Sequence, residues 1–140
     1  VTARAGIALV LEPLNTRDTP GFLVSTSDAA LAAIDAAGCA NLQLQFDLYH
    51  AQVMEGDLAA RLQRHLPRIG HVQLADNPGR HEPGTGEINF PFLLRRLDEL
   101  GYEGWVGVEH DKADIGGGNY PASTAIAAWY IRNVLQKIYA

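Results

Sequence analysis

Hydrophobic residues in this chain alternate between short β-rich runs and longer segments with helical spacing. In the longer segments the apolar residues recur three or four apart, as on one face of a helix. We expect strands at residues 6–14, 42–50, 70–76 and 105–110. We expect helices at residues 25–38, 56–69, 89–101 and 121–140. The pattern therefore predicts four strand–helix units in succession.

Residues at the helix ends support this assignment. Gly38 and Gly101 stand where helices are expected to stop, and Pro91 stands in the first turn of a helix. Asp57 is a candidate N-cap for the helix that follows it. These signals favour helices of ordinary length for a globular protein.

The spacing of the expected strands indicates a parallel sheet. Successive strands begin about 30 to 35 residues apart, which is the length of a β-crossover-β unit. Four such units make half of a (β/α)8 TIM barrel, whose usual length is about 250 residues. An open doubly wound sheet is the alternative, but no glycine-rich fingerprint follows the first strand. We interpret residues 1–140 as about the C-terminal four βα units of a TIM barrel, cut from a longer chain because it opens without Met and almost directly into a strand.

The composition of the chain argues against nucleic acid and membrane as binding partners. The 140 residues are 47% hydrophobic and 19% charged, with a net charge of −5, and no basic cluster suggests a nucleic-acid surface. No apolar run approaches the roughly 20 residues of a membrane span, and no signal peptide is visible. A single cysteine, Cys39, fits a reducing compartment. We therefore expect a cytoplasmic protein with no nucleic-acid or membrane partner.

Each expected strand carries a side chain with a metal-competent oxygen at or near its C-terminal end. These residues are Glu12, Asp47, Gln73 and Glu109. In a parallel barrel these ends converge on the face where active sites are built. Three carboxylates and one amide carbonyl suit a hard octahedral cation, Mg²⁺ or Mn²⁺, and leave two positions for substrate oxygens. The sequence predicts a divalent-cation site at this face.

Four segments resemble the hydroxypyruvate isomerase family, within the xylose-isomerase-like TIM barrels. They read "LEPLNTRD", "FDLYHAQ", "HVQLADNPGRHEPGTGEINF" and "GWVGVEH", and the similarity to the 2-oxo-tetronate branch is strongest in "EPGTGEIN". The resemblance implies a barrel about twice this length. It also implies that Glu12, Asp47, Gln73 and Glu109 bind the metal, and that Glu12 and Glu109 act as an acid/base pair. After Glu109, "HDKADIGGGNYPAS" differs from the usual Glu-Tyr-Lys-Pro continuation of the family.

The activity that this resemblance implies is a metal-dependent aldose–ketose isomerisation of a small sugar acid through an enediolate. The substrate would be hydroxypyruvate or its isomer tartronate semialdehyde, or a 2-oxo-tetronate. The alternatives are a sugar epimerase or an inosose-type dehydratase of the same superfamily, and an inactive half-barrel fragment. A lone half-barrel is expected to expose an apolar sheet edge and an apolar inner face, so it could form homo-oligomers.

Two further residues are candidates for substrate binding. His50 lies three residues after Asp47, where related barrels place a histidine that contacts substrate, but it could instead be a loop histidine bonded to backbone. Arg80 could bind a substrate carboxylate through its planar guanidinium. The alternative for Arg80 is a pair with Glu82 or Glu87 that stabilises the loop.

The other potentially reactive side chains are expected to have structural roles and not to take part in catalysis. His65 lies on a helix flank and His71 begins a strand, while Tyr49 is expected to pack rather than react. Cys39, beside a helix stop, is expected to be inert. The glycines at 116–118 could form a phosphate-binding nest or only a flexible loop.

Overall fold

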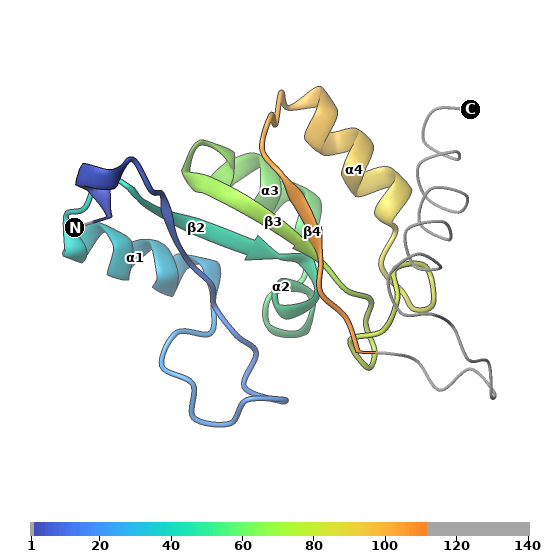
Figure 1. Ribbon diagram of the computed structural model, residues 1–140. Coiled ribbons are helices and arrows are strands. Elements are labelled where there is room, and N and C mark those ends of the chain that lie inside the picture. The colour runs from blue at the N-terminus through green and yellow to red at the C-terminus, as the bar shows by residue number, and fades with distance from the viewer. Residues whose placement is uncertain (1, 112–140) are drawn as a thin grey trace.

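The computed structural model describes residues 2–111, and within them the sheet has four parallel strands in the order β1-β2-β3-β4 (Figure 1). The strands are β1 (Leu9–Leu11), β2 (Leu42–Asp47), β3 (Ile69–Leu74) and β4 (Val106–Val108). Their neighbours in the sheet follow their order along the chain. A doubly wound sheet would reverse direction at a switch point, so this order confirms the expected half of a TIM barrel. The expected helix at 121–140 and the glycines at 116–118 lie outside the described residues.

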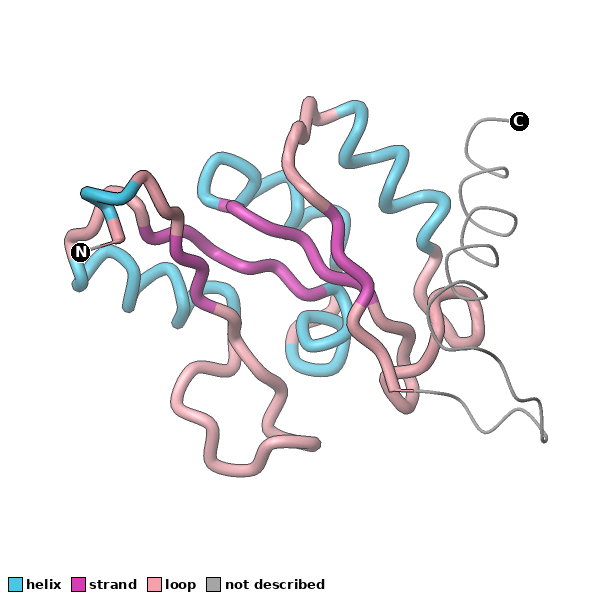
Figure 2. Tube along the Cα trace, in the orientation of Figure 1, coloured by secondary structure: helices cyan, strands magenta, loops and turns pink. Residues whose placement is uncertain are grey.

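Helices follow the strands along the chain (Figure 2). They are α1 (Ser27–Ala37), α2 (Leu48–Met54), α3 (Leu58–His65) and α4 (Phe90–Glu99), with 3-10 turns at Ala3–Ala5 and Leu66–Arg68. None of the helices within residues 2–111 has the length and apolar character needed to cross a membrane.

The hydrophobic core lies between the sheet and the helices. Leu44 and Phe46 from β2 and Val72 and Leu74 from β3 are buried there, together with apolar residues of all four α-helices. Because side chains alternate across a strand, this leaves the intervening residues of β2 and β3 on the opposite face. The sheet therefore has a helix-covered face and an inner face.

The ends of α1 and α4 form as their sequences indicate. Thr26 caps α1 by accepting a hydrogen bond from the backbone N–H of Ala29 at 3.2 Å, and Gly38 ends it in the left-handed conformation at φ 61°. Asn89 caps α4 by accepting from the N–H of Phe92. Asp57 occupies the N-cap position of α3, but its side chain makes no capping hydrogen bond, which corrects that expectation.

The first two strands differ from their expected extents. β1 is shorter than residues 6–14 and lies at the edge of the described sheet, where Leu9 and Val10 are 44% and 40% exposed. The second strand ends at Asp47 instead of residue 50, because the chain turns there into α2. The apolar side chain of Leu48 continues the strand pattern, so hydrophobicity alone does not reveal this helix.

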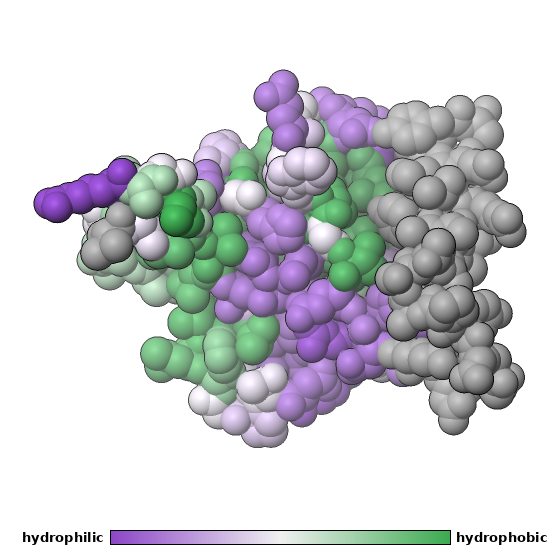
Figure 3. Space-filling view, in the orientation of Figure 1, coloured by the Kyte–Doolittle hydropathy of each residue, from purple (hydrophilic) through white to green (hydrophobic). Residues whose placement is uncertain are grey.

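The inner face of β2 and β3 is polar, contrary to the apolar inner face expected from the sequence. It carries Gln43, Gln45, His71 and Gln73. In the view of Figure 3, hydrophilic residues occupy the middle of the molecule, with hydrophobic patches on both sides of them. Gly70 lies so close to this polar row that an added Cβ would stand 2.6 Å from Gln43 Oε1. The exposed large apolar side chains of the sheet lie on its two outer strands, at Leu9 and Val10 of β1 and at Val108 of β4.

Candidate functional site

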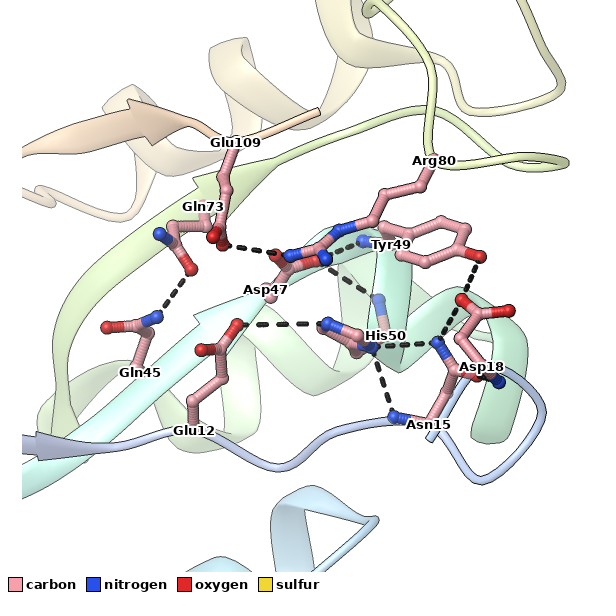
Figure 4. Close-up of polar contacts among 10 residues, drawn as sticks. All are labelled: Glu12, Asn15, Asp18, Gln45, Asp47, Tyr49, His50, Gln73, Arg80 and Glu109. Atoms are coloured by element: carbon pink, nitrogen blue, oxygen red, sulfur yellow. Dashed lines mark hydrogen bonds and ion pairs between the residues drawn. The ribbon is translucent and has the colours of Figure 1, made fainter. Parts of the chain in front are cut away.

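The four oxygen-bearing residues singled out in the sequence lie at the carboxyl ends of the four strands (Figure 4). Asp47 ends β2 and pairs in register with Gln73 of β3, while Glu12 and Glu109 follow β1 and β4. Parallel pairing brings these ends to one edge of the sheet. Their side chains point toward one another, so residues 97 positions apart in the sequence share one site.

The two carboxylate oxygens of Asp47 have different environments. Its Oδ1 accepts hydrogen bonds from the backbone N–H groups of Tyr49 and His50, at 2.7 and 3.1 Å, and so caps α2. Its Oδ2 is buried without a hydrogen-bond partner among the described residues. The side chain is 2% exposed, and this burial raises the pKa of Asp47 above its ordinary value.

Glu12 lies beside Asp47 and His50. Its Oε1 is 3.9 Å from His50 Nε2, and neither atom has a hydrogen-bond partner in the described part of the chain. Burial, followed by the negative charge of Asp47, raises the pKa of Glu12 to about 7. A carboxyl group with a pKa near neutrality can both accept and return a proton.

The unsatisfied atoms of this site fit a bound cation. One ligand atom each from Glu12, Asp47 and His50 lie within 4.8 Å of one another. Leaving two buried carboxylate oxygens without partners is costly unless a cation or substrate satisfies them. Gln73 adds an amide oxygen at the same edge, and the oxygens match the preference of Mg²⁺ or Mn²⁺.

Gln45 orients Gln73 and was not identified from the sequence. Its Nε2 donates a hydrogen bond to Gln73 Oε1, so the oxygen of Gln73 is the atom held between the two strands. The available signal was the strand period, because Gln45 shares the inner face with Asp47 two residues later. Hydrogen bonds of this kind fix the orientation of metal ligands.

Arg80 forms its ion pair with Glu109, with 2.9 Å between Nη2 and Oε2. The sequence had suggested Glu82 or Glu87 as the alternative partner. The carboxylate of Glu87 instead accepts hydrogen bonds from Gln52 and Asn77. Arg80 thus points into the site rather than along its own loop (Figure 4).

The loop that presents Arg80 is built around Asp76. The fully buried Asp76 carboxylate accepts four backbone N–H bonds, at distances from 2.7 to 3.1 Å; the donors are Asn77, Gly84, Gly86 and Ile88. An added Cβ at Gly86 would stand 2.2 Å from the carbonyl oxygen of Asn77, so this position requires glycine. Arg80 itself has φ 56°, in the left-handed region. The shape of the loop therefore places the guanidinium.

His50 is 3% exposed and lies in α2 with both ring nitrogens inside the site. Its Nδ1 contacts Asn15, on the loop after β1, and that loop also contacts Tyr49 through Asp18. Neither Asn15 nor Asp18 was identified from the sequence, because their contacts span 31 to 35 residues. Burial lowers the pKa of His50 below its ordinary value.

The remaining candidates lie elsewhere. Tyr49 is buried in the core, as expected, although its hydroxyl donates to Asp18. His65 is buried on the helical side, 3.7 Å from Asp28. His71 lies on the inner face close to Gly107, and Cys39 is exposed.

A family model described as "Xylose isomerase-like TIM barrel" matches residues 1–132. The chain belongs to this family. Relatives of the chain include 2-oxo-tetronate isomerase from Cupriavidus necator, 47% identical over 108 residues, and hydroxypyruvate isomerase from Escherichia coli, 48% identical over 104 residues. These alignments cover 77% and 74% of this chain, but only 42% and 40% of the two relatives.

Solved structures of similar proteins agree with the fold. A structure titled AP endonuclease, family 2, from Brucella melitensis matches with a TM-score of 0.81 and 37% identity, over 94% of this chain and 48% of that one. The 3-keto-D-glucoside 4-epimerase of E. coli matches with a TM-score of 0.77 and 31% identity, over 91% and 47%. The chain thus spans about half the length of these relatives.

Proposed function

We propose that the protein containing this chain is a metal-dependent aldose–ketose isomerase that acts on a small sugar acid. The substrate would be hydroxypyruvate, tartronate semialdehyde or a 2-oxo-tetronate. The observation that carries this proposal is the meeting of Glu12, Asp47, Gln73 and Glu109 at one edge of the sheet, with buried carboxylate oxygens left unsatisfied. The names of the two isomerases nearly half identical to this chain support the same class of reaction.

The same four residues would hold the cation, Mg²⁺ or Mn²⁺. A bound cation supplies polarisation of the substrate carbonyl and stabilises negative charge on the enediolate. Asp47 Oδ2 is available for this role because the helix cap uses only Oδ1. Gln45 would keep the amide oxygen of Gln73 in place.

Glu12 and Glu109 would also move the proton. The reaction removes a proton from the hydroxyl-bearing carbon and returns one to the former carbonyl carbon, so it needs a general base and then a general acid. Glu12 and Glu109 follow the two outermost of the four strands and can approach the substrate from opposite sides. In the site without a cation, burial and the negative charge of Asp47 raise the pKa of Glu12 to about 7, and a bound cation would lower it.

His50 and Arg80 would bind the substrate. His50 presents Nε2 toward Glu12, where a hydroxyl or carbonyl oxygen would lie during the reaction. Arg80 would bind the carboxylate of the sugar acid by a charge-assisted contact, exchanging its present partner Glu109 for the substrate. This exchange would release Glu109 for the cation.

The test uses the full barrel that contains this chain. With Mn²⁺ or Mg²⁺ present, it should interconvert hydroxypyruvate and tartronate semialdehyde, or isomerise a 2-oxo-tetronate, with proton exchange in D₂O. Glu12→Gln should lower kcat by about 100-fold or more, while the exposed control Glu99→Gln should leave it unchanged. Absence of turnover on all these substrates would refute the proposal.

A ketose epimerase is the second candidate. It is favoured by the match to 3-keto-D-glucoside 4-epimerase, which has the same half-barrel at 31% identity. An epimerase would invert one carbon without moving the carbonyl, so identification of the product separates the two reactions.

The chain of 140 residues alone should show little turnover, because half a barrel cannot enclose the substrate and exclude water.

A further inference from the structure

His50 Nδ1 is occupied by Asn15. The backbone N–H of Asn15 donates to this nitrogen at 3.0 Å, and the side-chain Nδ2 of Asn15 lies 2.8 Å from it. Asn15 is fully buried, so this contact is shielded from water. The two residues are 35 positions apart and come from different βα units.

This contact decides where the proton of the neutral ring sits. A backbone N–H can only donate, so Nδ1 must offer its lone pair and carry no proton. A neutral imidazole has one proton, and it must therefore be on Nε2. That nitrogen is the one that faces Glu12 Oε1 at 3.9 Å.

The side chain of Asn15 is itself held in place by hydrogen bonds within its own loop. Its Oδ1 accepts from the backbone N–H groups of Arg17 and Asp18, at 3.0 and 2.8 Å, and its Nδ2 donates to Asp18 Oδ2 at 2.9 Å. The same Asp18 oxygen accepts from the hydroxyl of Tyr49, which adjoins His50 in α2. These hydrogen bonds form a network that joins the loop after β1 to the start of α2 (Figure 4).

We propose that Asn15 is a positioning residue for His50, whose backbone N–H fixes the neutral ring as the Nε2–H tautomer with that proton directed into the site. His50 Nε2 then cannot serve as a cation ligand, although it lies close to the oxygens of Glu12 and Asp47. The cation is left to the oxygen donors, and Nε2–H becomes a donor to a substrate oxygen. The catalytic use of this proton rests on the proposed isomerase function, whereas the tautomer does not.

The tautomer can be measured directly by nitrogen NMR. The full barrel that contains this chain, labelled with ¹⁵N-histidine, is recorded at a pH about two units above the ordinary pKa of histidine, and His50→Gln identifies the signals of His50. We expect a protonated Nε2 and an unprotonated Nδ1, both unchanged when Mg²⁺ is added. A proton on Nδ1, or loss of the Nε2 proton with Mg²⁺, would overturn the proposal.

Two substitutions of Asn15 test the cause. Asn15→Pro removes the donating N–H and should give a mixture of both tautomers. Asn15→Ser keeps the N–H, with a hydroxyl that can cap the turn, and should keep the wild-type tautomer. If Asn15→Pro does not fold, the wild-type and Asn15→Ser spectra still decide, because Nδ1 protonation in either contradicts the proposal.

The result is independent of turnover. An Nε2–H tautomer in a full barrel that isomerises none of the substrates would leave this inference standing and refute the function. Turnover by a barrel in which Nδ1 of His50 carries the proton would support the function and refute this inference.

Discussion

Arg80 Nη2 lies 2.9 Å from Glu109 Oε2, and this ion pair joins the loop after β3 to the end of β4. Glu109 is 53% exposed at the side chain, so solvent weakens the attraction between the two charges. A substrate carboxylate or a cation can therefore replace either partner at modest cost. The pair orients Arg80 over the site before substrate binds.

Arg80 is expected to contribute to substrate binding more than to turnover. In the full barrel, Arg80→Ala should raise KM for the sugar acid by about 10-fold to 100-fold, as expected for a lost hydrogen bond to a charged group. Arg96→Ala, which removes a surface pair with Glu99, is the matched control. Steady-state kinetics measure both, and an unchanged KM in Arg80→Ala would show that Arg80 does not bind the carboxylate.

Substitutions of Asp47 should separate its cap from its cation site. Asp47→Ala should abolish binding of Mg²⁺ or Mn²⁺ in calorimetry. It should also lower the free energy of unfolding by about 0.5–2 kcal/mol through loss of the α2 cap. Asp47→Asn keeps an oxygen that can cap, so it should weaken cation binding with a smaller loss of stability. Full cation binding by Asp47→Ala would exclude Asp47 as a ligand.

The raised pKa of Glu12 predicts a dependence of stability on pH. The folded chain binds the Glu12 proton more tightly than the unfolded chain does. In EDTA, the free energy of unfolding should therefore fall as pH rises from 4.5 to about 7. The full shift corresponds to about 3 kcal/mol, which partial solvent exposure of the carboxyl reduces to about 1–2 kcal/mol. Urea unfolding measures this, and Glu12→Gln should flatten the decline. If the free energy of unfolding of Glu12→Gln declined equally with pH, the decline would come from other titratable groups.

Asp76 should be more important for stability than other acids in the chain. Asp76→Ala would leave four backbone N–H groups of its loop without their acceptor, and it should cost at least about 3 kcal/mol in free energy of unfolding. Asp35→Ala, which removes an exposed pair with Arg68, should cost less than about 1 kcal/mol. Similar losses in the two variants would contradict the structural role of Asp76.

The sequence alone predicts the sheet and the edge at which the site forms. The period of the apolar residues indicates four strand–helix units, and short parallel crossovers put all strand ends on one side. For this reason Glu12, Asp47, Gln73 and Glu109 can be singled out before any coordinates are known. The C-terminal end of α1 is also predictable, because Gly38 acts within one turn of the helix.

Tertiary structure decides the features that depend on contacts distant in the chain. The seven-residue α2 forms where the apolar pattern still reads as strand, because Asp47 caps it and Leu48 packs into the core. The pairing of Arg80 with Glu109, and of Asn15 with His50, joins different βα units. Local sequence can specify backbone conformation within a turn or two. Which atoms of distant residues meet, and thus which nitrogen of His50 carries its proton, depends on how the units pack.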